Sequence, residues 1–109
     1  MKKGYVDIIS DGNRTVYNEM PGCLKRCGGI GDILTGTLGT FNYWCHNNAK
    51  NFEQKTNEQE VTQPTLIAAY AASAFVKDCS KRAYKKFHRS LLAVDIIEEI
   101  SETFYELYE

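Results

Sequence analysis

A glycine-rich segment with basic residues before it and an acidic residue after it is the strongest candidate for chemistry in this chain. It reads Arg-Cys-Gly-Gly-Ile-Gly-Asp over residues 26–32, and a helical pattern begins at Asp32. Glycines let the backbone turn tightly so that several N–H groups point at one place. A helix start adds unpaired N–H groups and the positive end of the helix dipole. Such a segment suits a phosphate, or the charge that develops on a transferring phosphoryl group.

Asp32 would lie at the mouth of this anion site, and Lys25 and Arg26 add positive charge beside it. A carboxylate there can accept a proton from a substrate hydroxyl as that hydroxyl attacks phosphorus. The same pattern fits a plain loop in which Asp32 only begins a helix, and the residues alone favour neither interpretation. The segment is not a Walker A loop, because no Gly-Lys-Ser/Thr follows. It is not a dinucleotide fingerprint either, because the strand and turn spacing before it does not fit.

Composition excludes several classes of protein. The 109 residues include 13 Lys plus Arg and 14 Asp plus Glu, for a formal net charge of −1, and 43% are hydrophobic. This excludes a disordered polyelectrolyte and argues against nucleic acid as the main partner. The longest apolar stretch, residues 66–76, is far shorter than the roughly 20 residues of a membrane span, so no membrane partner is expected.

The four cysteines predict reduced thiols. No signal peptide follows Met1, so we expect a cytoplasmic protein, with a mitochondrial one as the alternative. Cys23, Cys27 and the Cys45-His46 pair lack the spacing of a zinc knuckle, so no metal site in the protein itself is expected.

An α/β arrangement has to position the glycine-rich segment. Strand patterns over 5–9 and 15–17 flank an Asp-Gly turn, and a loop follows over 19–30. Helical patterns cover residues 32–45 and 93–108. Between them, a third helical pattern restarts at 62–64 and becomes basic over 77–89. The acidic side of the last helix can neutralise the basic run. Polar residues 46–63 predict a flexible surface loop.

The helix over 66–76 is apolar on nearly every face and therefore needs cover on all sides. Two short strands and the last helix, with its apolar stripe of Val94, Ile97, Ile100, Phe104 and Leu107, are too little cover. Gly36 and Gly39, inside a helix, predict that something packs closely against them. We therefore expect a further layer, either more sheet on the N-terminal side or a partner chain. A small α+β domain with one poorly covered face is the alternative.

Several motifs in order carry a family resemblance. They are Lys3-Gly4-x-x-Asp7, the strand 7–10 with its Asp-Gly turn, Gly22 to Gly31 with Asp32, Leu34-x-Gly36, and later residues 68–72, 79, 84–86, 89–90 and 95–97. With these motifs the chain resembles the C-terminal third of ATP-dependent NAD(P)H-hydrate dehydratase. The resemblance extends over nearly the whole chain apart from 46–63.

The resemblance implies a ribokinase-like three-layer α/β/α domain, with 1–109 as its C-terminal segment. It implies a lyase that restores hydrated NADH or NADPH, with ATP phosphorylating the added hydroxyl, phosphate then leaving, and Mg²⁺ accompanying ATP. Asp32 would contact the hydrated nicotinamide and act as the catalytic base. The residues implied to bind ATP are Lys3, Gly4, Tyr5, Val6, Asp7, Gly22, Cys23, Leu24, Lys25, Arg26, Cys27, Gly28, Gly29, Ile30 and Gly31.

The chain departs from the family pattern in two ways. The usual residue at Ile30 is polar, commonly Gln, a change of small effect if only the backbone N–H acts. The family's N-terminal two thirds have no counterpart here, which agrees with the expected further layer and suggests a fragment. Two other functions stay open: a small-molecule kinase of the same superfamily, and a non-catalytic nucleotide-binding remnant.

Overall fold

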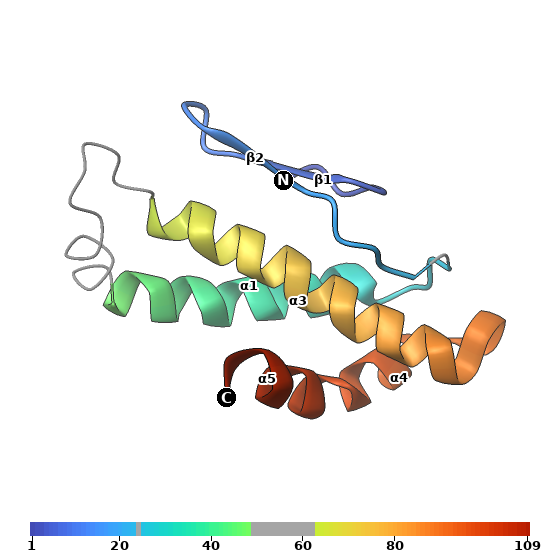
Figure 1. The fold of residues 1–109 in the computed structure, drawn as a ribbon. Helices are drawn as coiled ribbons and strands as arrows, with labels where there is room; N and C mark the ends of the chain where they lie inside the picture. Colours follow the sequence, from blue (N-terminus) through green and yellow to red (C-terminus); the bar gives the residue numbers. More distant parts are fainter. Residues whose placement is uncertain (24, 49–62) are drawn as a thin grey trace.

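The structure, a computed structural model, describes residues 1–23, 25–48 and 63–109. Its elements are β1 (Asp7–Ser10), β2 (Thr15–Asn18), α1 (Ile30–Asn47), α3 (Pro64–Phe87), the 3₁₀ helix η1 (His88–Ser90), α4 (Ala93–Glu98) and α5 (Ile100–Tyr108). The long helix α3 contacts each of the others. Figure 1 shows the hairpin on one side of the α1–α3 pair and α4–α5 on the other. The small α/β arrangement of a hairpin followed by helices is confirmed.

The hairpin forms around the expected Asp-Gly turn. β1 and β2 pair antiparallel, with Asp7 opposite Asn18 at the open end. In the turn, the Asp11 carboxylate accepts the Arg14 N–H at 2.7 Å, and backbone hydrogen bonds of this kind lower the pKa of Asp11. Gly12 takes a φ of +94°, which glycine adopts without the penalty a Cβ brings.

Helix α1 is longer than predicted at both ends. It begins at Ile30 because Gly29, at φ +100°, turns the chain, and the Gly29 carbonyl accepts the Ile33 N–H at 3.1 Å. It ends at Asn47, so the first two residues of the predicted loop 46–63 are helical. Residues 49–62 of that loop lie outside the described residues.

The prediction that the helix over 66–76 lacks cover is wrong for one side of the helix and agrees with the structure on the other, where Tyr70 is exposed and Ile67, Ala71 and Ala74 are partly exposed along one face. Leu66, Ala68, Ala72, Phe75 and Val76 are all buried within this chain, between the hairpin and the helices. These residues are buried because the small alanine side chains along α3 let the hairpin and α1 approach this helix closely. Farther along, burial raises the pKa of the Cys79 thiol to about 11, as expected for a packing residue.

The helix predicted over 93–108 is two helices that meet at Glu99. The Glu99 N–H donates to the Ile96 carbonyl at 3.0 Å, a spacing of three residues instead of four, which tightens the turn. Glu99 is buried and pairs with Lys86, 2.5 Å from Nζ to Oε1. Ile96, Glu99 and Thr103 therefore face inward. Three residues of the predicted apolar stripe, Val94, Ile97 and Leu107, are exposed, so the prediction that the stripe packs inward is wrong at these positions.

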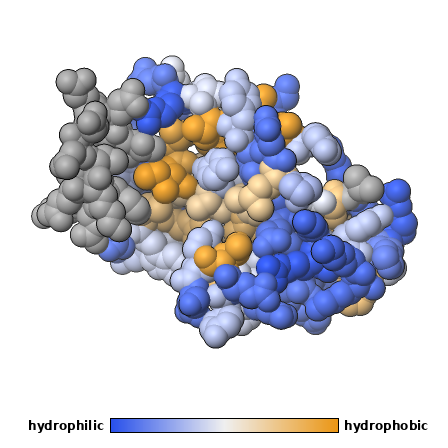
Figure 2. All heavy atoms as spheres, viewed as in Figure 1, coloured by the Kyte–Doolittle hydropathy of each residue, from blue (hydrophilic) through white to orange (hydrophobic). Residues whose placement is uncertain are grey.

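The predicted pairing of the basic half of α3 with the acidic last helices is confirmed. Besides the Lys86–Glu99 pair, Arg82 Nη1 lies 2.6 Å from Glu106 Oε2. Figure 2 shows a strongly hydrophilic surface where these elements meet, and hydrophobic residues between the hairpin and the first half of α3. Among the described residues, no helix is long and apolar enough to cross a membrane.

Candidate functional site

Two segments singled out in the sequence come together in space. Residues from the segments 3–7 and 22–31 line one cavity of about 570 Å³, and α3 supplies its third wall. The members of the predicted set in this lining are Lys3, Gly4, Tyr5, Asp7, Gly22, Cys23, Lys25, Arg26, Cys27, Ile30 and Gly31. Val6, Gly28 and Gly29 lie outside the lining. Leu24 lies outside the described residues.

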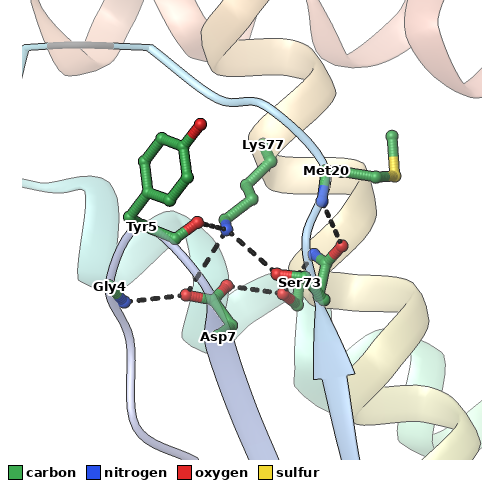
Figure 3. Close-up of polar contacts among 7 residues, drawn as sticks. Gly4, Tyr5, Asp7, Met20, Ser73 and Lys77 are labelled. Atoms are coloured by element: carbon green, nitrogen blue, oxygen red, sulfur yellow. Dashed lines mark hydrogen bonds and ion pairs between the residues drawn. The ribbon is translucent and has the colours of Figure 1, made fainter.

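The Asp7 carboxylate is buried where the hairpin meets α3 (Figure 3). Its Oδ1 accepts the Gly4 N–H at 2.9 Å and lies 3.7 Å from Lys77 Nζ, and its Oδ2 accepts the Ser73 hydroxyl at 2.5 Å. A buried carboxylate needs such partners. The bond to Gly4 bends the chain over residues 4–6, so β1 begins at Asp7 and not at Tyr5 as predicted. The Asp7 carboxylate therefore holds this bend through contacts with other residues of the same chain.

The end of β2 joins the same network through Asn18, which has no exposed surface. Its Nδ2 donates to Ser73 Oγ at 2.7 Å, and its Oδ1 accepts the Met20 N–H at 3.1 Å. Ser73 in turn donates to Asp7. This relay fixes both strands to α3 and sets the direction in which the chain leaves β2 for the glycine-rich loop.

The N-terminus of α1 lies at one end of the cavity, where Ile30 and Gly31 form part of its lining. The Lys3 ammonium lies over it, since a Cβ added to Gly31 would be 3.2 Å from Lys3 Nζ. The first N–H groups of a helix have no partner inside the helix and carry partial positive charge. Arg26 is exposed and lines the same cavity. An anion seated here meets backbone N–H groups, a lysine and an arginine together.

Other predicted residues serve the fold. Lys25 Nζ donates to the carbonyls of Arg89 and Leu91, at 2.6 and 2.8 Å, and so fixes the loop to the turn between α3 and α4. Gly29 lies against α4, because a Cβ on it would be only 2.9 Å from the Cβ of Ala93. These contacts hold the loop in place around the cavity.

Sequence reasoning missed the wall that α3 contributes. Ser73, Lys77 and Ser80 line the cavity. In the sequence, Ser73 stands only as an interruption of an apolar stretch and Lys77 as the first residue of a solvated basic run. Their spacing of four and then three residues places them on one helix face, which is the signal that could have found them.

Asp32 lies beside the cavity and not in its lining. It is exposed on the first turn of α1, where it lines a second hollow of about 470 Å³ between α1 and the helices α3, α4 and α5. Gly31, its neighbour in the chain, lines the cavity. The start of α1 thus has one side that faces the cavity and another side that carries a carboxylate. That arrangement can hold a phosphate and accept a proton from a hydroxyl beside it.

The cysteines and acidic residues do not assemble a metal centre in the part of the chain that the structure describes. No three His, Cys, Asp or Glu side chains there are grouped closely enough to hold a metal ion. All four cysteines are free thiols.

Comparison with known proteins places the chain in a family. Residues 1–102 match the family model for NAD(P)H-hydrate dehydratase. The chain belongs to the NAD(P)H-hydrate dehydratase family. The resemblance noted in the sequence is therefore confirmed, and the match includes both segments of the cavity and Asp32.

Curated members of the NAD(P)H-hydrate dehydratase family align with almost all of this chain. The ATP-dependent (S)-NAD(P)H-hydrate dehydratase of Dictyostelium discoideum is 42% identical over 99% of the chain and 35% of the relative. The proteins of the same description from Ciona intestinalis and Danio rerio are 37% and 36% identical, over 100% and 98% of the chain and 28% and 31% of their own length. The chain spans about a third of the length of these relatives.

Proposed function

We propose that this chain carries the ATP site and the catalytic base of an ATP-dependent NAD(P)H-hydrate dehydratase, within a ribokinase-like three-layer α/β/α fold. The observation that supports this most is the meeting of residues 3–7 with the loop 22–31 at the start of α1, with Asp32 beside them. In this reaction ATP, accompanied by Mg²⁺, phosphorylates the added hydroxyl of the hydrate, and loss of phosphate restores NADH or NADPH.

The residues of the cavity fit the phosphates of ATP. Lys3 and the N–H groups at the start of α1 would hold the terminal phosphates, because Gly31 leaves open the space that a Cβ would fill below Lys3 Nζ. Arg26, at the edge of the cavity, would offset part of the negative charge of the phosphates. Mg²⁺ bound with a nucleotide is usually held mainly by phosphates and water, so the proposal does not require an acidic cluster in the protein.

Asp32 would act on the hydrated nicotinamide from the adjoining hollow. Its carboxylate takes the proton of the substrate hydroxyl as the oxygen forms a bond to the γ-phosphorus and the bond to the ADP oxygen breaks. Lys3 and the helix N–H groups stabilise the charge that develops on the transferring group. The phosphate then leaves with the electron pair of its C–O bond, and the neighbouring ring carbon gives up a proton to water, so that the C–H electron pair forms the ring double bond of NADH or NADPH.

Replacing Asp32 by Asn tests this role, because it keeps size and shape and removes the proton acceptor. Turnover of NADPH hydrate, followed by the return of NADPH absorbance, should fall by roughly 10²–10⁴-fold while ATP affinity is retained. Glu98→Gln, at an exposed carboxylate on α4, is the matched control and should turn over normally. Near-normal turnover of Asp32→Asn would remove Asp32 from the mechanism.

The wild-type assay separates the other functions. Accumulation of a phosphorylated product without NADPH would indicate a small-molecule kinase. ATP binding without either product would indicate a nucleotide-binding protein that lacks the reaction.

A further inference from the structure

Lys77 reaches from α3 to the bend that precedes β1. Its Nζ donates to the Tyr5 carbonyl at 2.9 Å and to the Asn18 carbonyl at 3.4 Å, and lies 3.7 Å from Asp7 Oδ1 (Figure 3). Only 13% of the side chain is exposed. An ammonium has three N–H donors, and three oxygens of the chain face them here.

The bend that Lys77 contacts is a closed unit. Lys2 and Ile8 exchange two backbone hydrogen bonds of 2.8 Å, which fix both ends of the intervening segment. Between these ends, Gly4 is held by Asp7 and Tyr5 by Lys77. The position of Lys3, which projects from this bend toward Gly31, thus depends on those two side chains.

The same lysine also contacts the other segment of the site. A Cβ added to Gly22 would be 3.4 Å from Lys77 Cγ, so the aliphatic stem packs against the start of the loop 22–31. Lys77 therefore touches the first residue of one segment with its stem and the bend of the other with its ammonium.

We propose that Lys77 is a positioning residue of the nucleotide site. It fixes the bend at Tyr5 relative to the loop that begins at Gly22, and so holds the Lys3 ammonium over the start of α1. The proposal rests on the proposed function, in that ATP is the ligand. Because the oxygens of Tyr5, Asn18 and Asp7 engage its ammonium, Lys77 acts through Lys3 and does not contact the phosphates itself.

Lys77→Met tests the proposal, because it keeps the length of the stem and removes the three donors. We expect about tenfold weaker ATP binding, measured by titration of the full chain. Lys77→Arg restores the charge and donors and should recover most of the affinity. Lys85→Met, at an exposed lysine of the same helix, is the matched control and should bind within twofold of wild type. If Lys77→Met does not fold, Lys77→Gln replaces it, with the same expected loss.

Amide hydrogen exchange separates positioning from general destabilisation. In Lys77→Met, exchange should become faster in residues 3–7 while protection of α1 is unchanged. If Lys77 only stabilised the fold, its replacement would raise exchange both in residues 3–7 and in α1. ATP affinity within twofold of wild type would overturn the proposal, as would equal protection of residues 3–7.

The two proposals fail in different ways. If wild type binds ATP but does not dehydrate the hydrate, the proposed function fails and the role of Lys77 stands. If wild type binds no ATP, the nucleotide site fails, and with it the role of Lys77 in that site. If Lys77→Met binds ATP like wild type while the hydrate is dehydrated, only the role of Lys77 fails.

Discussion

Two pairs of glycines in and before α1 have different surroundings. A Cβ on Gly29 would lie 2.9 Å from the Cβ of Ala93, and one on Gly31 would lie 3.2 Å from Lys3 Nζ. At Gly36 and Gly39 an added Cβ would meet no described residue within 4 Å, and both glycines are exposed. The described residues therefore do not supply the close packing expected against the second pair, and its cover by a further layer or a partner chain stays a prediction. The first pair allows contacts that the fold and the site need, while the second pair leaves an open helix surface.

Gly29→Val should have the largest effect of any change at these glycines. A branched side chain at φ +100° is strained, and its Cβ clashes with Ala93, which is part of α4. We expect a loss of about 3 kcal/mol or more in the free energy of unfolding, measured by urea denaturation.

The neighbouring glycine is the control for that change. Gly28 has no positive φ, and a Cβ on it would have no described residue within 4 Å, so Gly28→Val should lower the free energy of unfolding much less. Equal losses at the two positions would show that the contact with Ala93 does not matter.

Gly31→Ala should affect ligand binding and leave the fold intact. The added Cβ meets only the flexible end of Lys3, so that side chain can move aside. Alanine also favours the helix by up to about 1 kcal/mol over glycine. We expect ATP affinity to fall about fivefold, or about 1 kcal/mol, while the melting temperature stays equal or rises. A fall in melting temperature with unchanged ATP affinity would contradict this assignment.

The elements that local chemistry determines are the ones that the sequence predicts well. The Asp-Gly pair gives the turn of the hairpin, and Pro64 occupies the first turn of α3, where its missing N–H costs nothing. The convergence of residues 3–7 and 22–31 follows from family motifs, and the structure brings these segments together. These features depend on residues that are close in sequence or on a known pattern.

Features that depend on tertiary contacts were not predictable in the same way. The break at Glu99 depends on a partner from α3, Lys86, which lies 13 positions earlier in the chain. The role of Lys77 depends on which residue of a basic run faces the hairpin, and composition does not distinguish it from Lys81 or Lys85. Likewise, the residue type alone does not predict that Gly31 lies against Lys3 while Gly36 lies where the described residues leave space.

The open pair of glycines gives the smallest expected effect. Gly36→Ala replaces a flexible residue inside a helix with the best helix former, and the new Cβ has free space. We expect the free energy of unfolding to rise by up to about 1 kcal/mol, seen as a melting temperature higher by up to about 4–8 °C. Gly12→Ala is the control, because Gly12 also has free space but a φ of +94°, so the change should lower stability. If Gly36→Ala lowers stability as Gly12→Ala does, the surface at Gly36 is covered in solution and the contrast between the two pairs of glycines fails.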